Sequence, residues 1–482
     1  MRVFTTGLLA LALGAALPAA AQETASRALQ QRVEARLAEA GPGIRFGLVV
    51  ATEDGRELIA IAPDSRFIPA SNTKLFTTAA AFATLQGLDR PDTGGGASVA
   101  LETERGQAPD VVLQGFGDAR LSSAPDCVTN CLAALADAVA ARTRRVRDVI
   151  GDDSFLPDQR WSPGMSWNNI PTASGTAISA LTLDDNEVPL RVTPAAQGEA
   201  PALDVLPYYR IDNRATTLAR GPAALGYDRL PGEMVLRLTG GIAGNAAPER
   251  LRLGIDDPAH YATWRLRTLL EARGVRVTGT LRTRHRPPGP AGVAAPAATE
   301  RELLLRLTPP PLVEDLRTIN KVSQNLHAEL LLRRLGRTGV GTGTIADGMT
   351  VIHAMLERAG LARTDYDFSD GSGMSTYNRI TPRGMVRFLR WANGQPWGAA
   401  WRTTFPIAGV DGTLARRFRA TALEGRLFAK TGSINATAAL SGTLTARSGR
   451  TLYFSILAND APESVRTILH MDAALVLIAE SN

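Results

Sequence analysis

Near its N-terminal end the chain has two short apolar runs and then a longer one. Residues 48–50 and 58–61 flank a polar turn at residues 53–55, a pattern typical of a β-hairpin. Residues 75–85 are apolar and rich in alanine, a composition that predicts a buried helix. Ser71 therefore stands at the expected beginning of this helix.

Toward the C-terminal end, helical and strand-like patterns alternate. Residues 312–335 carry apolar side chains at helical spacing, whereas residues 427–430, 439–444 and 452–457 are strand-like runs. The apolar stretch at residues 473–478 is too short to cross a membrane, so it predicts a core helix. These elements predict an α/β fold in which helices pack against an antiparallel sheet.

Two polar residues at the start of the first predicted helix have the spacing of a nucleophile and its base. Ser71 and Lys74 are three residues apart, so on a helix the amine lies beside the hydroxyl and takes its proton when the amine is neutral. Burial and a second nearby cation would each lower the pKa of Lys74, and Lys430 is the candidate for that cation. The structural alternative is a serine cap followed by a solvent-facing lysine.

A second polar motif interrupts the helical pattern at residues 312–335. Ser323, Gln324 and Asn325 follow one another there, and a hydroxyl with an amide can relay a proton and hold a substrate amide. A junction between two helices with exposed polar residues is the alternative.

The third motif, Lys430-Thr431-Gly432, ends the first C-terminal strand-like run. The glycine lets another backbone come close. An edge strand can pair with an extended peptide while Lys430 meets the terminal carboxylate of that peptide. The alternative is an ordinary strand end with a turn glycine.

In this order the three motifs resemble the S-x-x-K, S-D-N and K-T-G elements of penicillin-binding proteins and β-lactamases, with Gln324 in place of the aspartate. Five further segments have the same resemblance: residues 67–74 (FIPASNTK), 115–121 (GFGDARL), 151–154 (GDDS), 370–375 (DGSGMS) and 409–414 (GVDGTL). Over nearly its whole mature length the chain resembles the serine D-alanyl-D-alanine carboxypeptidases/endopeptidases, the low-molecular-mass class C penicillin-binding proteins.

This resemblance implies the catalytic roles. Ser71 would be the nucleophile and Lys74 its general base, and Ser323 would relay the proton toward the leaving amine. Gln324 leaves these roles unchanged, because they fall on the outer residues of its motif.

The resemblance also implies how the substrate is held. Asn325 would bind the substrate amide, and Lys430 with Thr431 would bind the terminal carboxylate of D-alanine. Beside Gly432, the backbone N–H groups of the nucleophile and of Ser433 would form the oxyanion hole.

The fold implied is a penicillin-binding transpeptidase/β-lactamase-like catalytic domain with nested, mainly β inserted domains. The reaction implied is hydrolysis of the D-Ala-D-Ala stem peptides of peptidoglycan, and also of its cross-links, without a cofactor, and β-lactams would acylate the same serine as inhibitors. One alternative is a β-lactamase, which the large insertion and the lack of an identifiable deacylation carboxylate disfavour. Another is a non-catalytic wall-binding or β-lactam-sensing module.

The first residues have the form of a secretory signal peptide. Arg2 precedes an apolar run at residues 7–17, and the alanines at 19–21 predict cleavage before Gln22. We therefore expect a periplasmic protein with no membrane span after cleavage. Loss of Arg2 lowers the formal charge from +6 to +5, an excess that suits an anionic wall polymer and does not indicate nucleic-acid binding.

Cys127 and Cys131 are the two cysteines, near a predicted helix start. An oxidising compartment favours a disulfide between them, whereas helical geometry at this spacing is near the limit that a disulfide allows, so both states stay open. No H-E-x-x-H pair is present and two cysteines do not make a four-thiolate site, so no metal is predicted. His327 is interpreted as a packing or surface residue.

Chain length and motif spacing predict several domains. Ser71 and Ser323 are 323 − 71 = 252 residues apart but must share one pocket, so the segment between them is predicted to leave and rejoin the catalytic part. Strand-like runs at residues 234–238 and 275–281 make this insertion mainly β, and the family resemblance implies two nested inserted domains. The predicted ranges are a signal peptide at 1–21, a catalytic domain at 22–90 and 299–482, inserted domain II at 91–178 and 262–298, and inserted domain III at 179–261.

Overall fold

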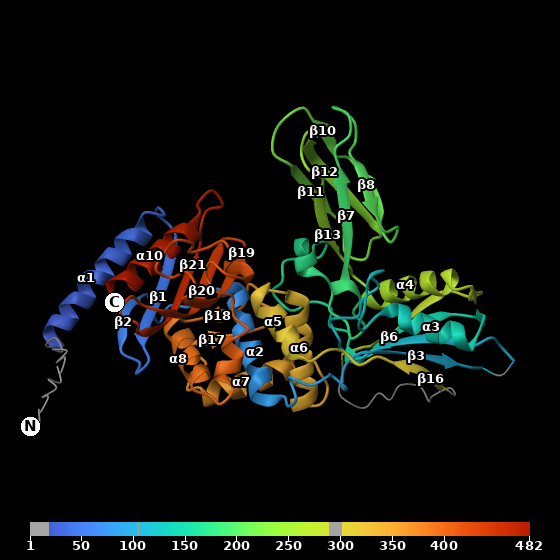
Figure 1. The fold of residues 1–482 in the computed structure, drawn as a ribbon, viewed down its shortest axis with the longest axis horizontal. Helices are drawn as coiled ribbons and strands as arrows, with labels where there is room; N and C mark the ends of the chain where they lie inside the picture. The colour runs from blue at the N-terminus through green and yellow to red at the C-terminus, as the bar shows by residue number, and fades with distance from the viewer. Residues whose placement is uncertain (1–18, 105, 289–300) are drawn as a thin grey trace, which may run out of the picture.

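The computed structural model describes residues 19–104, 106–288 and 301–482, with side chains from residue 26 onward. The predicted signal-peptide core at residues 7–17 lies outside these residues. Figure 1 shows one body that contains the C-terminus and two lobes built from the middle of the chain. Among the described helices, none is long and apolar enough to cross a membrane.

A five-stranded antiparallel sheet forms the centre of the first body. Its strand order is β19-β20-β21-β1-β2, so the two ends of the chain meet in one sheet and β19 lies at its edge. The predicted hairpin of β1 and β2 is confirmed. The strands are β1 (Arg45–Thr52), β2 (Glu57–Ile61), β19 (Leu427–Ile434), β20 (Thr437–Thr445) and β21 (Thr451–Asn459).

Helices cover both faces of this sheet, because alternate residues of its strands are buried on opposite sides. In β1, Leu48 and Val50 pack with α1 and α10, whereas Val49 and Ala51 pack in a second cluster with α2 and α5 to α8. The core helix predicted at residues 473–478 is confirmed as part of α10. The helices are α1 (Ala19–Ala38), α2 (Lys74–Thr84), α5 (Val313–Lys321), α6 (Asn325–Gly339), α7 (Ile345–Arg358), α8 (Pro382–Asn393), α9 (Gly398–Arg402) and α10 (Thr467–Ser481).

Short elements connect these layers. The small strands β17 (Tyr366–Asp367) and β18 (Arg379–Ile380) pair with each other. The 3-10 turns are η1 (Ala70–Thr73), η2 (Trp167–Asn169), η3 (Ala173–Gly175), η4 (Asp184–Asn186) and η5 (Gly412–Leu414).

A second five-stranded sheet forms the lobe on the right of Figure 1, together with α3 (Leu132–Arg142) and α4 (Pro258–Ala272). Its strand order is β15-β6-β4-β3-β16. β16 belongs to this sheet because it pairs with β3, although the sequence predicts that the catalytic part resumes at residue 299. We keep the predicted domain boundaries as a proposal. The strands are β3 (Ala97–Glu102), β4 (Asp110–Gly115), β6 (Val149–Pro157), β15 (Leu281–Arg286) and β16 (Arg301–Arg306).

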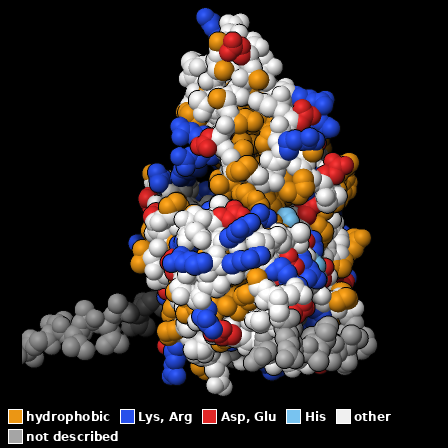
Figure 2. All heavy atoms as spheres, turned by 90° about the vertical axis from the view of Figure 1, so that its right-hand side faces the viewer, with side chains coloured by type: hydrophobic (Ala, Val, Ile, Leu, Met, Phe, Trp, Pro, Cys, Tyr) orange, Lys and Arg blue, Asp and Glu red, His pale blue; other side chains and the backbone are white. Residues whose placement is uncertain are grey.

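The upper lobe of Figure 1 is built entirely from strands of residues 187–254. One sheet has the order β13-β7-β8, and the other has β12 between β10 and β11, with β9 also paired to β12. Figure 2, which looks onto the inserted lobes, shows basic side chains spread over this half of the molecule, and all of those on the lobes are arginines. The strands are β7 (Glu187–Thr193), β8 (Ala202–Val205), β9 (Arg210–Asn213), β10 (Thr216–Leu218), β11 (Ala224–Asp228), β12 (Val235–Ala243) and β13 (Glu249–Gly254).

One predicted strand is wrong in its extent. Within residues 275–281, only the short strand β14 (Arg276–Val277) forms, and it pairs with β5 (Arg145–Val146). The next strand, β15, begins at Leu281. Gly279 separates the two strands. A Cβ atom at this glycine would lie 2.8 Å from the Arg147 carbonyl oxygen, so the close approach of the neighbouring backbone interrupts the strand.

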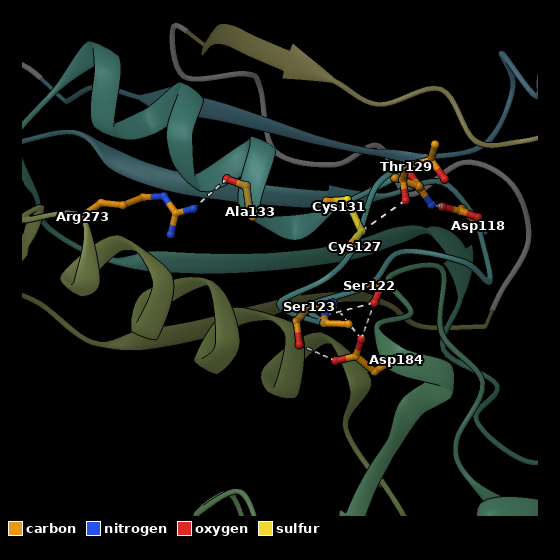
Figure 3. The surroundings of a disulfide bond; sticks show 11 residues. Asp118, Ser122, Ser123, Cys127, Thr129, Cys131, Ala133, Asp184 and Arg273 are labelled. Atoms are coloured by element: carbon orange, nitrogen blue, oxygen red, sulfur yellow. Dashed lines mark hydrogen bonds between the residues drawn. A yellow bond between two sulfur atoms is a disulfide. The ribbon is translucent and has the colours of Figure 1, made fainter.

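Cys127 and Cys131 form a disulfide in the loop before α3, with their Cα atoms 5.8 Å apart (Figure 3). Helical geometry does not oppose this bond, because Cys131 is the N-cap residue of α3 and has an extended backbone. In the same loop, the Ser122 and Ser123 hydroxyls both donate hydrogen bonds to Asp184. The disulfide therefore closes a short loop that polar contacts also hold.

Replacing both cysteines with serine is expected to lower the free energy of unfolding by about 2 kcal/mol, because the closed loop is short and restricts the unfolded chain only modestly. Urea unfolding of the parent and of the double variant measures this difference. Reduction of the parent is the matched control and is expected to give the same shift. An unchanged unfolding midpoint in both experiments would contradict a stabilising disulfide.

Candidate active site

Ser71 lies in the 3-10 turn η1, and α2 begins three residues later at Lys74. The sequence predicts that Ser71 opens the α-helix itself, but the chain first makes this tighter turn after Ala70, whose φ is 47°. The N-cap of α2 is Thr73, and no side chain caps the helix. The serine-cap alternative is therefore wrong, and the Ser71 hydroxyl is free to meet the lysine.

The Lys74 amine joins the first motif to the second and to the loop that contains Ser372. Its Nζ atom donates hydrogen bonds to Ser71 Oγ at 2.9 Å and to Asn325 Oδ1 at 2.6 Å. A third bond goes to the carbonyl oxygen of Ser372 at 2.5 Å. Lys74 is fully buried, so the structure excludes the solvent-facing lysine of the alternative interpretation.

Burial has the largest influence on this amine. It lowers the pKa of Lys74 to about 7, although the charges of Asp370 and Glu329 oppose the change. Near neutral pH much of the amine is therefore neutral and able to accept a proton. Lys430, which the sequence predicts to lower the pKa of Lys74, is not among the causes of this shift. The effect runs the other way: burial, with the charge of Lys74, holds the pKa of Lys430 well below its usual range.

The second motif lies at a junction between α5 and α6. Ser323 has a φ of 66°, a conformation that few non-glycine residues adopt, and it turns the chain between the two helices. Gln324 is the N-cap residue of α6, and its Oε1 atom accepts a hydrogen bond from the Leu326 N–H. The glutamine, which stands in place of the aspartate of the motif, therefore acts as a helix cap. Asn325 begins α6 and donates its Nδ2 hydrogen bond to the Ser174 carbonyl oxygen.

The third motif lies within β19. The sequence predicts that Lys430 to Gly432 end a strand, but β19 continues to Ile434 because its pairing with β20 extends to that residue. The predicted edge position is confirmed. Lys430 Nζ donates hydrogen bonds to Ser323 Oγ at 2.9 Å and to the Thr431 carbonyl oxygen at 2.8 Å. The second and third motifs are therefore in direct contact.

Gly432 allows the strand to approach the nucleophile. A Cβ atom at this position would lie 2.7 Å from the Pro69 carbonyl oxygen and 3.1 Å from the Ser71 nitrogen. Asn72 Nδ2 also donates a hydrogen bond to the Lys430 carbonyl oxygen at 3.0 Å. The backbone of β19 is thereby fixed beside the turn that carries Ser71.

These residues open into a cavity of about 540 Å³. Two residues of the upper lobe, Glu187 and Arg252, also line this cavity and lie 3.2 Å apart as an ion pair. Burial raises the pKa of Glu187 to about 7. Sequence reasoning missed both, because only the pairing of β7 with β13 brings them together. The predicted site residues in the lining are Ser71, Ser323, Asn325, Thr431, Gly432 and Ser433.

Glu329 is a second site feature that the sequence analysis missed. Its Oε1 atom accepts hydrogen bonds from the N–H groups of Gly371 and Ser372, and its Oε2 atom lies 2.6 Å from Arg333 Nη1. It therefore holds the loop whose Ser372 carbonyl contacts Lys74. A usable signal exists, since Glu329 follows Asn325 by one helical turn and shares its helix face.

Replacing Glu329 with glutamine is expected to lower the free energy of unfolding by about 3 kcal/mol, because Arg333 would stay buried without its charged partner. Equilibrium unfolding in urea measures this loss. Glu357→Gln on the exposed face of α7 is the matched control, with an expected change of less than about 0.5 kcal/mol. Equal effects of the two substitutions would contradict a structural role for the Glu329 carboxylate.

His327 lies outside the lining of the catalytic cavity, and its prediction as a packing residue is confirmed. It is buried, with Asp185 and Asp315 each 2.9 Å from one of its ring nitrogens. Burial lowers the pKa of His327, but the two carboxylates outweigh it and raise this pKa to about 9. The histidine therefore joins α6 to α5 and to the turn η4.

A serine beside a buried amine, next to an edge strand, is the site of a serine-type hydrolase that acts on peptide-like substrates. The chain belongs to the D-Ala-D-Ala carboxypeptidase 3 (S13) family, whose sequence profile matches residues 29–480. It is 34% identical to a D-alanyl-D-alanine carboxypeptidase of Actinomadura sp. (strain R39), over 99% of this chain and 89% of that protein. It is 28% identical to carboxypeptidase DacB of Mycolicibacterium smegmatis, over 93% and 84% of the two chains. The prediction of a serine-type peptidase is confirmed.

Solved structures confirm the predicted fold class. Penicillin binding protein 4 (dacB) from Haemophilus influenzae aligns with a TM-score of 0.77 and 20% sequence identity, covering 92% of this chain and 98% of that one. The same protein in complex with a β-lactam aligns with a TM-score of 0.72 and 19% identity, covering 92% and 97%. At this level of identity the likeness concerns the fold.

Proposed function

We propose that the protein removes the terminal D-alanine from the D-Ala-D-Ala stem peptides of peptidoglycan, and cleaves its peptide cross-links, through an acyl-enzyme on Ser71. The observation that carries this proposal is the 2.9 Å contact between Lys74 Nζ and Ser71 Oγ, at an amine whose pKa burial lowers to about 7. A neutral amine at this distance is a general base for the hydroxyl. β-Lactams acylate the same serine and act as inhibitors.

In the acylation step, Ser71 Oγ forms a bond to the carbonyl carbon while its proton passes to Lys74 Nζ. The N–H groups of Ser71 and Ser433 hold the oxyanion. When the C–N bond breaks, Ser323 relays the proton that Lys74 has taken to the leaving amine, so that Lys74 is neutral again. Lys430 holds the Ser323 hydroxyl in place through its 2.9 Å contact with Ser323 Oγ. D-Alanine then leaves, and an ester remains on Ser71.

In the second step, water attacks the ester carbonyl and Lys74 again takes the proton. The C–O bond to Ser71 breaks while Lys74 returns this proton to Ser71 Oγ, which releases the shortened peptide as a carboxylic acid and restores the hydroxyl. Asn325 holds the substrate amide through both steps. Lys430 and Thr431 bind the terminal carboxylate of the substrate, whose negative charge favours the protonated form of Lys430.

We place this activity in the periplasm, with peptidoglycan stem peptides as partners. The predicted signal peptide supports this location, and a disulfide between Cys127 and Cys131 suits an oxidising compartment. The substrate of a D-Ala-D-Ala peptidase is also found in the cell wall.

The test is release of D-alanine from a neutral N-acylated tripeptide that ends in D-Ala-D-Ala, measured alongside cleavage of a purified cross-linked dimer. Release of D-alanine supports the proposal, and loss of the dimer extends it to cross-links. Acylation by benzylpenicillin without any peptide hydrolysis would instead identify a β-lactam-sensing module. Rapid consumption of benzylpenicillin without an adduct would identify a β-lactamase.

A further inference from the structure

A second hollow lies directly beside the catalytic cavity. It has a volume of about 960 Å³ and is bounded by the β19–β20 turn, the segment around residues 416–421 and α10 from Thr467 to Glu480. The two cavities share Arg417, Ser433 and Ile468 in their walls. We call this second hollow the basic groove.

The charge of the basic groove is predominantly positive. Five arginines line it together with three carboxylates: Arg36, Arg416, Arg417, Arg419, Arg466, Glu463, Asp472 and Glu480. Asp472 is already neutralised by Arg417, 2.5 Å away. Arg416, Arg419 and Arg466 are exposed, and among the described residues none of these three forms an ion pair. Three guanidinium groups of the groove therefore stand outside ion pairs, against two carboxylates of its lining, Glu463 and Glu480, that also form none among the described residues.

The position of the groove along β19 indicates which part of the substrate reaches it. In the proposed complex the terminal carboxylate lies at Lys430 and Thr431, and the scissile carbonyl lies at the N–H of Ser433. From its carboxyl end toward its amino end, a peptide paired with β19 therefore lies first beside residue 431 and then beside residue 433. Its next residues arrive at Asn435 and Ala436, which line the groove.

We propose that the basic groove binds the carboxylate-bearing part of the stem peptide, the part that precedes the acylated D-alanine. This inference rests on the proposed function. Arginine suits carboxylates because its planar guanidinium group offers paired donors. The groove also presents apolar surface, since Ile468 and Leu469 are 38% and 52% exposed, and this surface can contact alanine side chains of the same peptide. The occupant is therefore an anionic peptide with small apolar residues.

The test compares two substrates with the parent and with a triple variant, Arg416→Ala, Arg419→Ala and Arg466→Ala. One substrate is the neutral tripeptide, and the other is a stem pentapeptide with free side-chain carboxylates. Exposed ion pairs are individually weak, so we expect the three substitutions to lower kcat/KM for the pentapeptide about tenfold more than for the tripeptide, mainly through KM. Raising the salt concentration is expected to reduce this difference in the parent.

The matched control is Arg145→Ala, Arg250→Ala and Arg276→Ala, which removes the same charge from exposed positions on the inserted lobes. We expect equal kcat/KM values for the control and the parent with both peptides. The rate of acylation by benzylpenicillin verifies that the groove variant is folded. A groove variant that loses both substrates equally, or neither, would overturn the proposal, as would a control with the same selective loss.

A binding measurement separates this inference from the proposed function. Calorimetric titration of the pentapeptide into Ser71→Ala protein needs no turnover, and the three groove substitutions are expected to raise its Kd about tenfold. If the parent hydrolyses neither peptide but this shift in Kd is present, the proposed function fails and the groove assignment stands. If both peptides are hydrolysed and Kd does not change, the groove assignment fails alone.

Discussion

Ser71→Ala protein is expected to release D-alanine from the neutral tripeptide at least about 10⁴-fold more slowly than the parent, because no other group near Lys74 replaces the lost nucleophile. The fold is expected to persist, since the substitution removes one oxygen from a residue that is not fully buried. Initial rates of D-alanine release over a range of substrate concentrations measure the loss.

Ser448→Ala provides the matched control for this prediction. Ser448 lies in the turn between β20 and β21, outside the lining of the catalytic cavity, and its loss is expected to leave the rate within twofold of the parent. Ser71→Ala protein that retained a tenth of the parent rate would contradict the assignment of Ser71 as the nucleophile.

Replacing Lys74 with methionine is expected to lower kcat/KM by about 10²–10⁴-fold, the usual contribution of a positioned general base. The two side chains have similar length, so the buried position stays filled. Apart from Lys74 and Lys430, the chain has one lysine, Lys321. Lys321→Met is the matched control, because Lys321 pairs with Asp411 and does not line the cavity. Equal losses in the two variants would contradict a specific role for Lys74.

The pH profile adds a second readout for Lys74. The neutral amine is the active base, so kcat/KM is expected to rise as the pH increases through about 7, the pKa that burial gives Lys74, and to level off above it. The residual activity of Lys74→Met protein is expected to lack this step. A parent profile that is flat between pH 5.5 and 8.5 would show that Lys74 does not titrate where its burial predicts.

The sequence predicted the elements that carry the chemistry, because each motif lies next to a strong local pattern. The apolar run at residues 75–85 located α2 behind Ser71, and the run at residues 427–430 located β19. The details of each junction were harder to predict. Local patterning does not distinguish a 3-10 turn from the first turn of an α-helix at Ser71, and it gives no sign of the positive φ at Ser323.

The residues that affect the pKa of Lys74, or that line the cavity from outside the motifs, were the hardest to predict from the sequence. Asp370 and Glu329 affect the pKa of Lys74 only because a loop folds back onto α6. Glu187 and Arg252 reach the cavity from strands of the upper lobe, and neither lies in a motif. Such contacts join segments that are far apart in the chain, and a single sequence does not record which of these segments meet. The place of β16 was hidden for the same reason, since this strand is placed by its pairing with β3.

The intact mass of the protein after mixing with benzylpenicillin, followed by peptide mapping of the adduct, tests whether Ser71 is the nucleophile. We expect a mass increase of one intact benzylpenicillin molecule, located on Ser71, and no increase for Ser71→Ala protein. An adduct on any other residue, or an equal adduct on the Ser71→Ala protein, would contradict the claim that Ser71 is the nucleophile that Lys74 activates.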